Sequence, residues 1–64
     1  MTSLTYREKQ VIHLLSMGQT AKEIARTLDL AHRTVEKYGS TLRKKLRAKN
    51  MTHAVSIVLQ NGIL

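Results

Sequence analysis

The sequence predicts an all-α domain, a compact four-helix fold that contains a helix-turn-helix. Three observations support this prediction. Apolar residues recur at helical spacing in four segments, capping patterns precede the first two segments, and the chain has no proline and three glycines. Since the chain has 64 residues, we expect one domain over 1–64, which buries about 60% of the surface that its unfolded form exposes.

The first helix is expected at about 6–17. Thr5-Tyr6-Arg7-Glu8 is a capping box, in which the threonine hydroxyl accepts from the amide three residues on and the glutamate reaches back to the threonine amide. An apolar face follows, made of Val11, Ile12, Leu14 and Leu15. Gly18 comes next and suits the left-handed conformation with which many helices end.

The next two helices are separated by the tightest joint in the chain. A second capping box, Thr20-Ala21-Lys22-Glu23, opens a helix at about 21–28, and residues 29–31 lead into a long helix at about 32–47. The long helix carries apolar residues three or four positions apart: Val35, Tyr38, Leu42 and Leu46. A short helix, a tight joint and a longer helix predict a helix-turn-helix.

The fourth helix is expected at about 51–61, with Asn50 as its cap and Gly62 at its end, where residues 63–64 fold back onto the core. It is uncharged and more apolar than a core-facing helix requires, which is typical of a protein interface. A core of this size could itself use most of these residues. The candidate dimer contacts are Met51, Val55, Ile57, Val58 and Leu59.

Positive charge is concentrated on the long helix. The chain has 11 Lys and Arg against 4 Asp and Glu, a net charge of +7. Residues 32–49 hold seven of the basic residues and one acidic residue, whereas residues 50–64 hold neither kind. Such clustering is typical of nucleic-acid binders, although a solvated basic face or a targeting signal at 43–49 has the same composition.

A helix-turn-helix with a basic second helix predicts binding to double-stranded DNA, with the long helix in the major groove. Glu36, Lys37 and Ser40 point away from the apolar face and are the candidates for reading bases. Candidates for phosphate contacts lie at the helix starts and along the basic segment. They are Thr20, Lys22, His32, Arg33, Thr34, Arg43, Lys44, Arg47 and Lys49. Glu36 has an alternative role, an ion pair with Arg33 on the same helix.

Other chemistries find little support. The chain has no cysteine, and its three histidines, His13, His32 and His53, are scattered without an acidic pair, so we expect no metal site. We find no Gly-rich phosphate loop, no catalytic triad and no apolar run long enough to span a membrane. The domain is therefore expected to be non-enzymatic, to need no cofactor and to bind no membrane.

Ordered matches to a known family run along essentially the whole chain: Leu4-Thr5-x-Arg7-Glu8, Leu14-Leu15-x-x-Gly18, Lys22-Glu23-Ile24-Ala25, Leu28, Arg33-Thr34-Val35-Glu36, Lys45-Leu46, Ala48-Lys49-Asn50 and Ala54-Val55. They resemble the DNA-binding domain of the LuxR/FixJ/GerE family of bacterial transcription regulators. The resemblance implies a cytoplasmic four-helix domain that binds promoter DNA as a homodimer through its last helix, with RNA polymerase as a further partner. The family's base-contacting positions fall on Glu36, Lys37 and Ser40.

Three positions depart from the family pattern. Ala31 stands where a capping serine is usual, Gly39 lies within the long helix where a larger residue is common, and Tyr38 replaces a frequent histidine. The first two each cost about 1 kcal/mol of helix stability. We therefore expect a recognition helix that DNA or a partner helps to order.

Two other functions compete with this interpretation. Region 4 of a sigma factor uses a similar helix-turn-helix, but residues 48–50 and the helix that follows them are arranged as in the LuxR pattern. A cationic module for an acidic protein or an anionic membrane would also be basic and amphipathic. In that case, however, the apolar face of the long helix would have to be free of the core.

Overall fold

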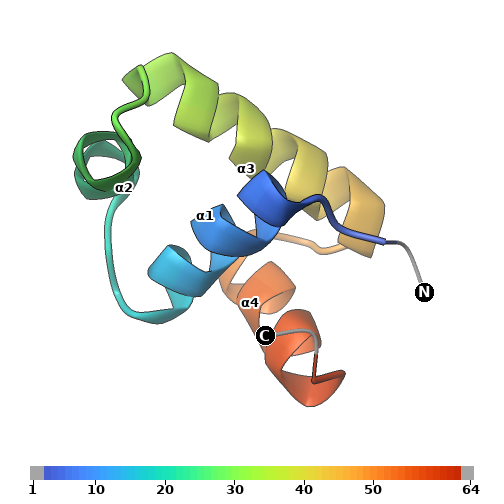
Figure 1. The fold of residues 1–64 in the computed structure, drawn as a ribbon. Coiled ribbons are helices and arrows are strands. Elements are labelled where there is room, and N and C mark those ends of the chain that lie inside the picture. The colour runs from blue at the N-terminus through green and yellow to red at the C-terminus, as the bar shows by residue number, and fades with distance from the viewer. Residues whose placement is uncertain (1–2, 63–64) are drawn as a thin grey trace.

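The computed structural model describes residues 3–62, and within them the chain forms four α-helices and no strand. They are α1 (Tyr6–Ser16), α2 (Ala21–Leu28), α3 (His32–Leu46) and α4 (Met51–Gln60), shown in Figure 1. The all-α prediction is confirmed. Three of the helices end one residue earlier than expected, because Met17, Arg47 and Asn61 are cap residues. The expected packing of residues 63–64 lies outside the described range.

Both predicted capping boxes are present. The Thr5 hydroxyl accepts from the Glu8 amide at 3.1 Å, and Glu8 Oε1 accepts from the Thr5 amide at 2.8 Å. At the start of α2, Thr20 and Glu23 make the same two bonds at 3.2 and 2.8 Å. These bonds satisfy amides that have no partner inside the helix, and so they define where α1 and α2 begin.

Left-handed residues end the first three helices. Gly18 has a φ of 92°, as its position predicts, but the other two are Asp29 at 55° and Arg47 at 53°. After each of them the next amide bonds back across the turn, from Leu30 to the Ala25 carbonyl at 2.8 Å and from Ala48 to the Arg43 carbonyl at 2.9 Å. This is the Schellman pattern, and at Asp29 it makes the tight turn between α2 and α3.

The start of α4 has a cap of its own. Asn50 Oδ1 accepts from the His53 amide at 2.8 Å, and His53 Nδ1 accepts from the Lys49 amide at 3.0 Å. By contrast, Ala31 makes no side-chain bond at the start of α3. Side-chain hydrogen bonds therefore fix the joint between α3 and α4. The first turn of α3 lacks such a bond and depends on its packing against the other helices.

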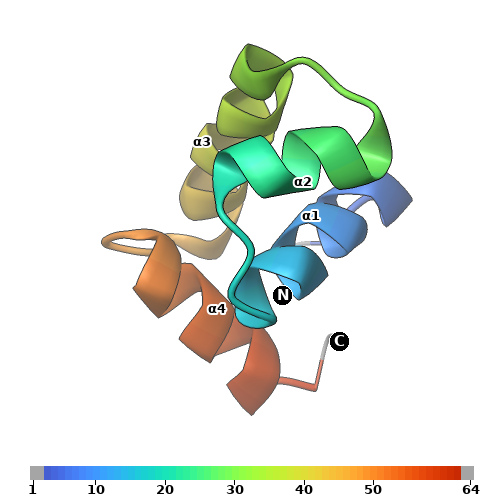
Figure 2. The same cartoon turned by 90° about the vertical axis from the view of Figure 1, so that its left-hand side faces the viewer.

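The core lies between α1 and α3, each of which contacts all three other helices. Its fully buried residues come from every helix: Val11, Ile12, Ile24, Leu42, Ala54 and Val58. In Figures 1 and 2, α2 and α4 lie on different sides of the α1–α3 pair and do not meet. This arrangement buries one side of α3 and leaves its opposite side free.

One ion pair fastens α1 to α3. Lys45 Nζ donates to Glu8 Oε1 at 2.8 Å, and the Glu8 side chain is 5% exposed against 30% for Lys45. Burial raises the pKa of Glu8 and is the largest single influence on it. The hydrogen bonds from Lys45 and Thr5 and the charge of Lys45 outweigh burial and hold that pKa below its ordinary value of 4.5.

We expect Gly39→Ala to stabilise the domain by about 1 kcal/mol, because Gly39 has ordinary helical backbone and a Cβ there would meet only Met51 Sδ, at 3.8 Å. Thermal denaturation would show the gain as a melting temperature about 4–8 °C higher. Gly18→Ala is the matched control and should destabilise, since Gly18 has a positive φ. A lower melting temperature for Gly39→Ala would contradict this account.

Acid should weaken the fold through Glu8. Because the folded-state pKa lies below the unfolded one, the stability that ionised Glu8 contributes is complete above the ordinary value and is lost as the pH falls through the folded-state pKa. Urea titrations across this range should show a falling free energy of unfolding, and a shallower fall for Glu8→Gln. The capping hydrogen bonds with Thr20 lower the pKa of Glu23 as well, so the fall should be shallowest when Glu8→Gln and Glu23→Gln are combined. An equally steep fall in Glu8→Gln would refute the assignment.

Candidate nucleic-acid interface

The free side of α3 forms a polar ridge. Val35, Leu42 and Leu46 are buried against the other helices, and the residues on the opposite side of the same helix point outward. Spacings of three and four residues put four of these side chains in one line: Arg33, Lys37, Ser40 and Lys44. Because the ridge carries three cations and no acidic group, it is the most basic line on the helix.

The three candidates for base reading lie together on or beside this ridge. Lys37 and Ser40 belong to it, and Glu36 borders it on one side. Glu36 and Lys37 are exposed and Ser40 is half-buried. Among residues 3–62 no ion pair joins Glu36 to Arg33, so the carboxylate of Glu36 is free to accept a hydrogen bond from a ligand.

The candidates for phosphate contacts fall into three groups. Thr20 and Lys22 lie at the start of α2, where the capping box uses the amides of Thr20 and Glu23 and leaves those of residues 21 and 22, with the helix dipole, to favour an anion. His32, Arg33 and Thr34 form the first turn of α3. The third group lies at the far end of α3 and just beyond it, and consists of Arg43, Lys44, Arg47 and Lys49. All of these except Arg47 line a shallow hollow of about 310 Å³, together with Ser40 and Ala48.

An apolar groove of about 300 Å³ runs beside α3 on the side of Glu36 and Arg43. Its floor includes Val35, Gly39 and Met51, and it is open partly because Gly39 has no side chain. It belongs to the same face as the start of α2, since Ala21 lines it too. The groove separates the α2 group of phosphate candidates from the ridge.

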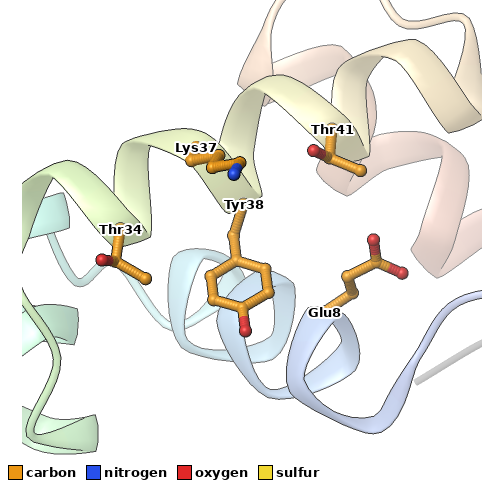
Figure 3. Close-up of a pocket in the computed structure, with 5 residues that line it drawn as sticks. All are labelled: Glu8, Thr34, Lys37, Tyr38 and Thr41. Atoms are coloured by element: carbon orange, nitrogen blue, oxygen red, sulfur yellow. The ribbon is translucent and has the colours of Figure 1, made fainter.

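A polar hollow of about 320 Å³ lies on the other side of α3 (Figure 3). Thr34, Lys37, Tyr38 and Thr41 line it from α3, and Glu8 turns its carboxylate toward it from α1. Sequence reasoning missed Thr41 and the partnership of Glu8 with Lys45. The only signal for Thr41 was its spacing of seven residues from Thr34, which puts both threonines on one face of a helix.

The candidate dimer residues of α4 differ in their exposure to solvent. Val58 is 0% exposed and is part of the core, so its side chain is not available to a partner, contrary to the expectation. Leu59 is 58% exposed, whereas Met51, Val55 and Ile57 are half-buried and pack on the core. Val55 and Leu59, four residues apart, share one side of α4 with the exposed Thr52 and Ser56, and Ile57 lies on another side.

No other chemistry is assembled in the described part of the chain. Residues 3–62 contain no group of three His, Cys, Asp or Glu side chains that could hold a metal ion. None of the helices described is long and apolar enough to cross a bilayer. The apolar side of α3 is buried in the core, which argues against its use as a lipid-binding face.

Comparisons with known proteins agree with this geometry. Residues 2–58 match the model of the bacterial regulatory proteins of the luxR family. The chain is 41% identical over 63 residues to the transcriptional activator protein BjaR1 of Bradyrhizobium diazoefficiens, covering 98% of this chain and 26% of that protein. It is 36% identical over 62 residues to the transcriptional regulatory protein FixJ of Rhizobium meliloti, covering 97% and 30%.

Solved structures lead to the same result. A VqmA dimer of Vibrio cholerae, described as a LuxR-type receptor, superposes with a TM-score of 0.92 at 34% identity, over 97% of this chain and 28% of that one. A VqmA–ligand–DNA complex gives a TM-score of 0.88 at 35% identity, over 94% and 26%.

The chain spans less than a third of the length of these relatives, so the likeness concerns their helix-turn-helix domain. The match favours a transcription regulator over region 4 of a sigma factor. The chain belongs to the luxR family of bacterial regulatory proteins and forms a helix-turn-helix domain of a transcription regulator.

Proposed function

We propose that this domain binds double-stranded promoter DNA sequence-specifically, with α3 in the major groove and with two copies paired through α4. The observation that carries the proposal is the two-sided character of α3. One side of the helix is buried in the core, and the other presents a basic ridge that has no partner within residues 3–62. A helix of this diameter fits the major groove of B-DNA.

The ridge supplies the base contacts. Lys37 donates to the O6 and N7 acceptors of a guanine, Glu36 accepts from the amino group of a cytosine, and Ser40 bonds to either kind of base. The three groups of phosphate candidates, which include Arg33 and Lys44 at the two ends of the ridge, fix its orientation on the duplex. Support comes from the relative whose structure is a complex with DNA.

Pairing through α4 would use its exposed side. Leu59 is the most exposed apolar residue of that helix, and Val55 and the small polar side chains of Thr52 and Ser56 lie beside it. A two-fold interface brings the same residues of both copies together, so this side has to be self-complementary. A structural relative that forms a dimer supports this arrangement.

Selection of bound sequences from random duplexes, with the stoichiometry measured alongside, tests the proposal directly. The selected DNA should contain two inverted half-sites whose centres lie about 10 bp apart. The logarithm of the affinity should fall with the logarithm of the salt concentration, with a slope of about −0.9 per phosphate contacted. An affinity that does not change with salt, or a selection that yields no common sequence, would disprove sequence-specific binding.

Substitutions of Lys37 and Lys44 should have different effects on DNA binding, although both residues are exposed lysines of one ridge. Lys37→Ala should weaken binding to the selected site by about 1–3 kcal/mol and relax the preference at one base pair. Lys44→Ala should weaken binding to all sequences about equally and reduce the salt slope by about 1. Anisotropy titrations with matched and mismatched duplexes measure both effects, and an unchanged preference in Lys37→Ala would contradict its role as a base reader.

Leu59→Glu should abolish pairing without unfolding the chain, because Leu59 is 58% exposed. Sedimentation should then show a monomer, and binding to two half-sites should lose its cooperativity while binding to one half-site persists. Gln60→Glu is the control, because Gln60 is an exposed neighbour of Leu59 and its substitution adds the same negative charge. An equal effect of both substitutions would show that charge alone, and not the leucine, is responsible.

A further inference from the structure

The polar hollow between α1 and α3 has features that base reading does not explain. Thr34 and Thr41 both line it (Figure 3), and within residues 3–62 neither hydroxyl takes part in a hydrogen bond. Lys37 lies at its border with the ridge. The hollow therefore contains unused donors on a face of α3 that adjoins the ridge.

The position of this face decides what can meet it. A helix with its side chains is about 10–12 Å across and the major groove is about 12 Å wide, so the two flanks of a helix lying in the groove meet the two sugar–phosphate backbones. The flank with Glu36 and Arg43 adjoins the start of α2, where phosphate candidates already lie. The opposite flank is the hollow, and it should meet the other strand.

Glu8 lines the same hollow, and an unpaired carboxylate there would repel a phosphate. The ion pair resolves the conflict. Lys45 bonds to Glu8 Oε1 at 2.8 Å and cancels its charge, so the hollow keeps the positive charge of Lys37. Because the ammonium group of Lys45 is bonded to Glu8, it is not available to contact the duplex. The hydrogen bonds and the charge of Lys45 lower the pKa of Glu8, which favours its carboxylate form.

We propose that Thr34 and Thr41 each donate a hydrogen bond to a backbone phosphate of one DNA strand, and that Lys45 makes this possible by neutralising Glu8. Seven residues of helix put the two threonines about 10 Å apart along α3, so they hold different phosphates of the same strand. Thr41 is thus a further DNA contact, and Lys45 is a positioning residue that does not touch DNA. The inference rests on the proposed function and adds to it the contacts to the second strand.

Single uncharged methylphosphonates, placed one at a time along both strands of the selected site, provide the test. For the unmodified chain, binding should weaken about tenfold at each contacted phosphate. Thr41→Val should weaken binding to normal DNA by a similar factor and lose the sensitivity at one phosphate only. Thr34→Val should lose it at a different phosphate of the same strand. Thr27→Val, on the exposed side of α2, is the control and should keep the full profile.

The outcomes separate this inference from the proposed function. If the unmodified chain shows no sequence-specific binding, the proposed function fails. If it binds and Thr41→Val keeps the sensitivity of the unmodified chain at every phosphate, the hollow is not a phosphate site and the inference is overturned.

The role of Lys45 has its own test. Glu8→Gln removes the negative charge and frees Lys45, so binding at low salt should tighten about fivefold. Lys45→Met leaves Glu8 unpaired and should weaken binding about tenfold, and Glu8→Gln with Lys45→Met should restore it. Melting curves identify any variant that fails to fold. If Lys45→Met unfolds, the test rests on Glu8→Gln alone. DNA binding by Glu8→Gln that is unchanged or weaker than that of the unmodified chain would overturn the neutralising role of Lys45.

Discussion

The structure depends on the burial of one side of α3. Leu42 is 0% exposed, and with Val35 and Leu46 it attaches a helix of strongly basic composition to the rest of the chain. The cations of α3 repel one another, and the helix has neither a side-chain cap at Ala31 nor a larger residue at Gly39. Apolar burial against α1, α2 and α4 therefore holds in place a helix that its own sequence does little to stabilise.

The ion pair between Glu8 and Lys45 does a second task besides packing. A buried charge is costly unless it is paired, and here one carboxylate oxygen accepts from both a lysine and the amide that starts α1. The pair thereby ties the cap of the first helix to the last turn of the third. It also determines which cation of that turn is unavailable to a ligand, because Lys45 bonds to Glu8 of α1 whereas its neighbour Lys44 lies on the ridge.

Local patterns predicted the parts of this fold that depend on local interactions. The capping boxes at Thr5 and Thr20 and the outward side of α3 follow from spacing within a few residues. Glu8 and Lys45 are 37 residues apart, so no local pattern could pair them. Val58 was misplaced because the apolar residues of α4 spread over a wide arc of the helix, and periodicity then cannot separate core from surface within that arc.

The end of α3 shows a choice between stability and charge. Arg47 adopts a φ of 53°, which glycine would adopt with less strain, and the turn it makes leads directly to the cap of α4. A glycine there would remove a cation from the cluster at the end of the basic helix. A left-handed arginine costs about 1 kcal/mol of stability, in a domain whose core is small. A contact between the Arg47 guanidinium and a DNA phosphate would explain why an arginine, and not a glycine, occupies this position. The same reasoning does not apply to Asp29, whose short polar side chain tolerates this conformation.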